Sequence, residues 1–240
     1  MEKRRIRGSE NTNGIPAAAL LFRWVLFLCV LLIITFPAGP AAWAAKKAVP
    51  GKKKFDAAAE EHFWKGVALE KAGRYQEALD EFNRTIQLEP KHDWAYKHCG
   101  VILNRQNKFK QAIEFFDKAI ELNPRYSKAF NNRGVAYGKL GRHKQALKDF
   151  DAAIELNRDY AEAYYNRGVA RSKISDYEQA VQDYSAAIRL DSRDAMAYYM
   201  RGLANEALGR KKQFAEDMKK AARLGDKDAR NLLQTRNIKP

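Results

Sequence analysis

Small and large apolar residues recur at a fixed interval of 34 positions between residues 59 and 228. A glycine keeps this interval at Gly66, Gly100, Gly134, Gly168 and Gly202. A leucine keeps it at Leu88, Leu122, Leu156, Leu190 and Leu224. A large apolar side chain holds a third place, at Phe82, Phe116, Phe150, Tyr184 and Met218. Chance does not align several residue classes over so many periods, so the chain is built from internal repeats.

Each period carries the pattern of two amphipathic helices joined by a turn. In the third period the first helical face consists of Ala129, Phe130, Gly134, Val135 and Tyr137. Gly141 is placed to end that helix. The second apolar face consists of Ala146, Leu147, Phe150, Ala153, Ile154 and Leu156. In the first two periods Pro90 and Pro124 stop the second helix, because proline cannot continue a helix.

The sizes of the recurring residues indicate how the two helices pack. Glycine at the eighth place and alanine at the twentieth let the helices approach closely, and the large residue at the twenty-fourth place fills the remaining space. The alanine series runs through Ala78, Ala112, Ala146 and Ala180 and ends where Phe214 replaces it. A second series of Ala119, Ala153, Ala187 and Ala221 has Thr85 as its variant. We therefore expect altered packing in the fifth period.

At these residues the chain resembles the tetratricopeptide repeat family. Five repeats are assigned to residues 59–92, 93–126, 127–160, 161–194 and 195–228. The resemblance implies an all-α fold, a right-handed α-solenoid of five helix-turn-helix repeats. The usual terminal proline is replaced by Arg158, Ser192 and Asp226 in the last three repeats. We expect residues 226–236 to contain a capping helix, with 229–240 as cap and tail, because Ala229, Leu232 and Leu233 have helical spacing.

One pair of charged positions varies together from repeat to repeat. Arginine precedes the glycine at Arg133, Arg167 and Arg201, and aspartate follows sixteen residues later at Asp149, Asp183 and Asp217. The first repeat has Lys65 and Glu81 at these places, whereas the second has the uncharged Cys99 and Phe115. The simplest interpretation is an ion pair between the two helices of a repeat. We therefore interpret these arginines as structural rather than ligand-binding.

The first 44 residues have the features of an export or anchoring signal. A basic start is followed by an uncharged apolar run over residues 24–36, and residues 42–44 match the small-x-small pattern of a signal peptidase site. We interpret residues 1–44 as a secretory signal peptide. The alternative is an uncleaved anchor, because Trp43 suits a membrane interface and the lysines between Lys46 and Lys54 hinder translocation.

These two interpretations give two localisations. With cleavage, the protein is exported to the periplasm or the extracellular space. Without cleavage, it is a single-pass membrane protein anchored through residues 17–44. In both cases residues 45–58 form a basic linker that precedes the first repeat.

Composition excludes several classes of protein. Hydrophobic residues make up 46% of the 240 residues and charged residues 30%, which favours a packed core over a disordered chain. Cys29 and Cys99 are the two cysteines in the sequence, so a disulfide-stapled scaffold and a cysteine-rich metal site are excluded. The formal net charge is +15, and most of it lies beyond residue 44.

No recurring catalytic pattern is present in the sequence. It lacks a phosphate-binding glycine loop, a dinucleotide fingerprint, a zinc helix motif and a nucleophile elbow. The histidines His62, His92, His98 and His143 have no metal-ligand spacing with a cysteine, and the carboxylates lie in charged helix faces. The Asn83-Arg84-Thr85 sequon falls within a predicted helix and is discounted. We therefore expect no enzyme activity, no cofactor and no metal.

The resemblance implies a function in protein recognition. In the family, the first helix of each repeat lines a concave groove. The matching places here are Trp64, Trp94, Lys97, His98, Asn104, Arg105, Lys128, Asn131, Asn132, Lys139, Tyr165, Asn166, Lys173, Tyr199 and Met200. Amides, aromatic rings and lysines on one face suit an extended peptide or a helix of a protein partner. The alternative is a structural role, in which some of the aromatic residues, Trp64 and Tyr165 above all, pack between adjacent repeats.

Some family members hold a peptide C-terminal carboxylate with a clamp of lysine and asparagine residues. Lys97 and Asn132 match two places of that clamp. Val101 replaces an asparagine, Glu162 a lysine and Asn166 a basic residue. The clamp is incomplete, which argues against recognition of a chaperone tail.

Polyanion binding is the alternative function. A strongly basic domain attracts nucleic acid, anionic lipid or acidic polymers, and the lysines of residues 46–54 add a basic arm. Against nucleic acid, charges of both signs are interleaved along most predicted helices, and export would separate the protein from DNA and RNA. We therefore expect an envelope-associated scaffold that binds a protein partner, with an anionic membrane surface as the alternative ligand.

Overall fold

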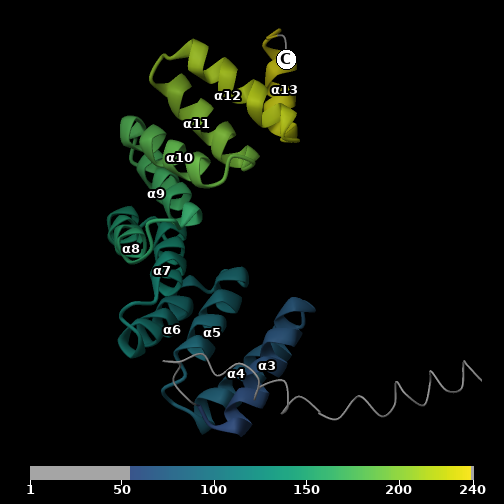
Figure 1. Cartoon of the computed structure of the whole chain (residues 1–240), viewed down its shortest axis with the longest axis vertical. Coiled ribbons are helices and arrows are strands. Elements are labelled where there is room, and N and C mark those ends of the chain that lie inside the picture. The colour runs from purple at the N-terminus through teal and green to yellow at the C-terminus, as the bar shows by residue number, and fades with distance from the viewer. Residues whose placement is uncertain (1–54, 239–240) are drawn as a thin grey trace, which may run out of the picture. The chain divides into compact units, whose positions relative to one another are not determined.

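The computed structural model describes residues 55–238 (Figure 1). The predicted signal or anchor at residues 1–44 and most of the predicted linker lie outside the described residues. In the described part, none of the helices has both the length and the apolar character needed to cross a membrane.

The described residues form five helix-turn-helix repeats and one further helix. The repeats consist of α3 (Ala57–Lys71) and α4 (Tyr75–Leu88), α5 (Asp93–Arg105) and α6 (Phe109–Leu122), α7 (Ser127–Lys139) and α8 (His143–Leu156), α9 (Ala161–Lys173) and α10 (Tyr177–Leu190), and α11 (Ala195–Ala207) and α12 (Lys211–Arg223). The last helix is α13 (Lys227–Thr235). The all-α solenoid is therefore as predicted, although α3 begins two residues before the expected start of the first repeat.

The helices stack in chain order, as Figure 1 shows from α3 to α13. Each first helix packs against the second helix of its own repeat, and each second helix packs against the next first helix. First helices of successive repeats also contact one another, from α3–α5 through α9–α11. Because this approach is closer than that between successive second helices of the described repeats, the first helices form the inner side of the stack. We call this surface the first-helix face.

Close contact between the two helices of a repeat depends on the recurring glycine. A Cβ atom added to Gly134 would lie 2.7 Å from Cε1 of Phe150, and one added to Gly100 would lie 2.6 Å from Cε1 of Phe116. Side-chain carbons do not approach this closely, so no larger residue fits without displacing the ring. The predicted small–large complement is confirmed.

The fifth repeat keeps the glycine and changes its partner. A Cβ atom on Gly202 would meet Met218, and the ring at Phe214 is buried against Met218, Ala229 and Leu233. Two of these residues belong to α13. The aromatic group has thus moved toward the end of the solenoid, where it completes the core beneath the capping helix. The altered packing predicted for the fifth repeat is therefore present, and it brings Phe214 into contact with the capping helix α13.

Each turn between the two helices of a repeat places one residue in the left-handed region. This residue is Gly73, Gly141 or Gly209 in alternate repeats, and Asn107 or Ser175 in the others, with φ of 60° and 63° for the latter two. In the third repeat the backbone N–H of Arg142 then bonds the carbonyl of Tyr137 at 2.9 Å. The role predicted for Gly141 as a helix end is confirmed.

The predicted ion pairs between helices are present. Arg133 Nη2 bonds Asp149 Oδ1 at 2.7 Å, Arg167 Nη2 bonds Asp183 Oδ1 at 2.7 Å, and Arg201 Nη2 bonds Asp217 Oδ1 at 2.6 Å. Lys65 Nζ reaches Glu81 Oε1 at 2.7 Å in the first repeat.

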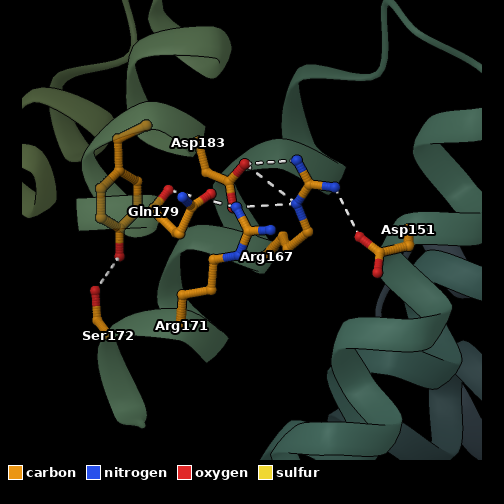
Figure 2. A network of polar contacts seen from close by, with 7 residues as sticks. Asp151, Arg167, Arg171, Ser172, Gln179 and Asp183 are labelled. Carbon is orange, nitrogen blue, oxygen red and sulfur yellow. Dashed lines mark hydrogen bonds and ion pairs between the residues drawn. The ribbon is translucent and has the colours of Figure 1, made fainter. Parts of the chain in front are cut away.

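Two of the arginines also reach back to the preceding repeat, which sequence reasoning did not foresee. Arg133 Nη1 bonds Asp117 Oδ1 at 2.6 Å, and Arg167 Nη1 bonds Asp151 Oδ1 at 2.7 Å. Figure 2 shows Arg167 between Asp151 and Asp183. These contacts form a ladder in which each arginine joins the two helices of its own repeat to the second helix of the repeat before it.

The glycine contact predicts opposite effects for two substitutions on α7. Gly134→Leu should lower the free energy of unfolding by more than about 3 kcal/mol, because the added carbons collide with Phe150. Gly138→Ala, on the same helix with nothing within 4 Å of its added Cβ, should raise it by about 0.5–1 kcal/mol. Urea unfolding of both variants measures the effects. Equal effects at the two sites would contradict the packing account.

The ladder predicts unequal effects for its members. In the structure the Asp183 side chain is 3% exposed and that of Asp151 is 57% exposed. Burial raises the pKa of Asp183, so its charged form depends on Arg167 and Arg171. Arg167→Ala should therefore cost about 3 kcal/mol of stability, whereas Asp151→Ala should cost about 0–1 kcal/mol.

Thermal unfolding of the two variants tests this ordering. Partner affinity should stay nearly unchanged in Arg167→Ala, because the arginine lies in the ladder. A large loss of affinity without a loss of stability would contradict its structural assignment.

Candidate functional site

The first-helix face collects one stripe of side chains from each repeat. On α7 the stripe is Lys128, Asn132, Val135 and Lys139, with spacings that keep all of them on one side of a helix. The corresponding residues on α5 are Trp94, His98, Val101 and Arg105, and those on α9 are Glu162, Asn166, Val169 and Lys173. Because the first helices contact one another in order, these stripes lie side by side.

The predicted site residues differ in exposure. Trp64, Arg105, Lys128, Lys139 and Lys173 are exposed. A larger group is half-buried: Trp94, Lys97, His98, Asn104, Asn132, Tyr165, Asn166, Tyr199 and Met200. Asn131 has no exposed surface.

Amide side chains join the first helices of successive repeats. Asn104 Nδ2 donates to the backbone carbonyl of Asn132 at 3.1 Å, and Asn166 Nδ2 donates to Asn131 Oδ1 at 3.0 Å. The amides are therefore oriented by neighbouring repeats before any ligand binds, which lowers the entropy cost of binding through them.

The assignment of Asn131 as a ligand contact is corrected by its burial. Its Nδ2 donates to the Tyr160 hydroxyl and to Glu162 Oε1, both at 3.2 Å, while its Oδ1 accepts from Asn166. All of its polar atoms are engaged within the protein. Asn131 positions Asn166 and Glu162 instead of facing a ligand.

A polar chain links α3 and α5 near the N-terminal end of the face. His98 Nδ1 lies 2.6 Å from Glu70 Oε2, and His98 Nε2 lies 2.8 Å from Lys97 Nζ. With Glu70 ionised, the imidazole donates through Nδ1 and accepts the lysine proton at Nε2. The ammonium group of Lys97 is thus held in place by a neighbouring repeat. Glu70 occupies the place of Asn104 in the first repeat, so the 34-residue interval could have identified it from the sequence.

Burial lowers the pKa of Lys97 from 10.5 to about 8, with Glu70 opposing this shift and Lys128 adding to it. Burial also lowers the pKa of His98, although the hydrogen bond that His98 donates to Glu70 opposes this shift. A lysine that has lost part of its hydration and stands near a second cation gains more from an incoming carboxylate than a fully solvated lysine does.

The aromatic residues of the face have different surroundings. Trp64 is 42% exposed and donates from Nε1 to Glu60 Oε2 at 2.8 Å. Tyr165 packs on Tyr184, with ring centroids 5.8 Å apart, and Tyr199 packs on the cluster beneath α13. Tyr184 belongs to the same repeat as Tyr165, but Tyr165 also packs on a cluster that includes Ala197 of the fifth repeat, so its ring lies between repeats. The ring of Trp64, in contrast, is accessible.

Lysines dominate the exposed charge at the middle of the face. Lys128, Lys139 and Lys173 make no ion pair with another residue in the described range 55–238. Together with Lys97 they place unneutralised positive charge on α5, α7 and α9. No group of three or more His, Cys, Asp or Glu side chains within that range could hold a metal ion.

Comparison with known proteins identifies the family. Models of the tetratricopeptide repeat match residues 59–92, 94–126, 127–160, 161–194 and 195–226, which together make up more than half of the chain. The chain therefore belongs to the tetratricopeptide repeat family. A sequence comparison with curated proteins found no match.

Several solved structures share the fold. MamA from Desulfovibrio magneticus RS-1 superposes with a TM-score of 0.65 and 22% identity, over 71% of this chain and 97% of that protein. YrrB, described as a TPR protein with an unusual peptide-binding site, superposes with a TM-score of 0.60 and 21% identity, over 72% of this chain and 90% of that protein. PilF of Pseudomonas aeruginosa superposes with a TM-score of 0.68 and 18% identity, over 73% of this chain and 80% of that protein. At these identities the matches show the fold alone.

The state of Lys97 predicts a pH dependence of stability. Its pKa is lower in the folded chain than in the unfolded one, so between about pH 8 and 10.5 the unfolded chain binds the extra proton. This contribution to the free energy of unfolding therefore increases as pH rises through that window. Lys97→Met should remove the increase, whereas Lys144→Met, at an exposed position of α8, should keep it. Urea unfolding from pH 7 to 10 measures the difference, and identical pH profiles would contradict it.

Proposed function

We propose that the protein is a binding scaffold whose first-helix face holds an extended peptide or a helix of a protein partner. The observation that supports this most strongly is the combination of unpaired lysines and pre-oriented amides on adjacent first helices. Amides bond a peptide backbone, and the lysines favour acidic side chains between them. Trp64 adds an accessible ring for an apolar side chain at the N-terminal end of the face.

The proposed ligand is an acidic peptide segment. Lys97, Lys128, Lys139 and Lys173 face it from three neighbouring repeats, and Glu162 is the one exposed carboxylate of the described α5, α7 and α9 stripes. Lys97 takes up a proton when a carboxylate binds, so affinity should fall as pH rises above about 8. Membrane targeting of this scaffold within an envelope complex is part of the same proposal and rests on the sequence of residues 1–44.

Selection of peptides from a random display library tests the ligand class. The full chain should enrich acidic sequences, and Lys97→Gln with Lys128→Gln should weaken the selected peptides by at least tenfold, because two facing cations are lost. The matched control is Lys144→Gln with Lys148→Gln, which removes the same charge from exposed positions of α8 and should leave affinity within about twofold. Enrichment of sequences without acidic residues, or equal losses in both variants, would contradict the proposal.

A second candidate is binding to an anionic membrane surface, favoured by the charge on α12. Lys211, Lys212, Lys220 and Arg223 are exposed and make no ion pair with another residue of the described repeats. Such a cluster attracts anionic lipid by about 1 kcal/mol per charge near the surface. Capture from solubilised membranes separates the two functions. Capture of a defined protein that persists at high salt and is lost in the variant with Lys97→Glu and Asn132→Asp supports the scaffold. Capture that high salt abolishes regardless of these substitutions supports binding to the membrane surface.

A further inference from the structure

The ladder is incomplete at its last step, between the fourth and fifth repeats. Arg201 pairs with Asp217 as its counterparts do, but its Nη1 bonds the neutral Oγ of Ser185 at 3.0 Å. Ser185 stands where the preceding repeat has Asp151. The inter-repeat contact has therefore lost a carboxylate at this joint.

A second side chain is also truncated at the same joint. In the fourth repeat, Arg171 Nη1 donates to Asp183 Oδ2 at 2.8 Å and to the backbone carbonyl of Gln179 at 3.4 Å, as Figure 2 shows. The fifth repeat has Asn205 at this place, and its Nδ2 reaches Asp217 Oδ2 at 3.3 Å. A short amide thus replaces a long guanidinium beside an equivalent carboxylate.

A cavity of about 290 Å³ lies where the longer side chains would be. It is lined by Val181, Ser185, Arg201, Asn205, Arg210, Gln213, Glu216 and Asp217. Gln213 and Glu216 are exposed, so the cavity can be reached from solvent. It lies between α10, α11 and α12, on residues other than those of the first-helix face.

Among the charged groups that line the cavity, one carboxylate has no ion pair with a described residue. Arg201 is neutralised by Asp217, and Arg210 Nη2 is bonded to Glu178 Oε1 at 2.7 Å. Glu216 makes no ion pair with another described residue, and it replaces the neutral Gln182 of the fourth repeat. A guanidinium entering the cavity would take the place of the Asn205 amide at Asp217 Oδ2, the position that Arg171 holds at Asp183 Oδ2, and would find Glu216 as an additional carboxylate.

We propose that the cavity beside Asp217 is a binding site for a guanidinium group, supplied by an arginine side chain of a partner protein or by a free guanidino compound. The occupant replaces in trans the contact that Arg171 makes within the chain one repeat earlier. This inference is independent of the proposed function, because the first-helix face contributes none of its residues.

The test uses the full chain with ¹⁵N-labelled arginine, and N-acetyl-arginine methylamide as the probe. The Nε–H signal of Arg201 should shift on titration in the millimolar range, while those of Arg133 and Arg167 stay unchanged. N-acetyl-citrulline methylamide has the same shape without the charge and should give no shift. No response to the arginine probe, or an equal response to the citrulline probe, would overturn the proposal.

Two variants test the position of the site, one by filling the cavity and one by opening the equivalent space one repeat earlier. Asn205→Arg should fill the cavity, abolish the response at Arg201 and raise the unfolding midpoint by about 2–4 °C. Arg171→Asn should open the equivalent space at the preceding joint, so that the Arg167 signal begins to respond. A retained response in Asn205→Arg would show that the probe binds elsewhere.

The source of the guanidinium is resolved by comparing ligands. A peptide with one arginine flanked by alanines that binds at least tenfold more tightly than the capped amino acid supports a protein partner. Equal affinities support a free guanidino compound. Failure of both ligands would overturn this site without affecting peptide binding at the first-helix face.

Discussion

The structure depends on one steric constraint, the close approach of two helices at a glycine in every repeat. A Cβ atom at Gly66, Gly100, Gly134 or Gly168 would lie within 2.8 Å of a phenylalanine or tyrosine ring. Because this contact recurs every 34 residues, each helix pair has the same geometry and the pairs stack regularly. The regular stacking is what brings the polar side chains of successive first helices onto one face.

Ion pairs link successive repeats once the steric contact has fixed each helix pair. Arg133 and Arg167 each bind a buried aspartate in their own repeat and an exposed aspartate in the preceding one. At the first joint Cys99 stands in place of the arginine and packs in one buried cluster with Leu79. The last joint has Ser185 and Asn205 and retains a cavity. The joints between repeats therefore differ in chemistry along the solenoid, while the glycine contact recurs within every repeat.

Most of the fold could be predicted from the sequence because its determinants are local and periodic. The glycine, alanine and aromatic positions gave the repeats, and the co-variation of Arg167 with Asp183 gave the ion pair within a repeat. The contact from Arg167 to Asp151 was missed, because the two residues belong to different repeats. The comparison that identified the ion pair considered only positions within one repeat. The burial of Asn131 was also missed, because it depends on Tyr160 at the end of the same repeat and on Glu162 of the following repeat. The prediction for residues 1–44 stays a prediction.

Lysine footprinting with a bound acidic peptide tests the central claim, that the first-helix face is the binding surface. The chain is acetylated briefly with and without peptide, and each lysine is quantified by mass spectrometry. We predict protection of Lys97, Lys128, Lys139 and Lys173, with no change at the exposed Lys144, Lys148 and Lys212 of the second helices. Protection confined to the second helices, with the four first-helix lysines unchanged, would contradict the account.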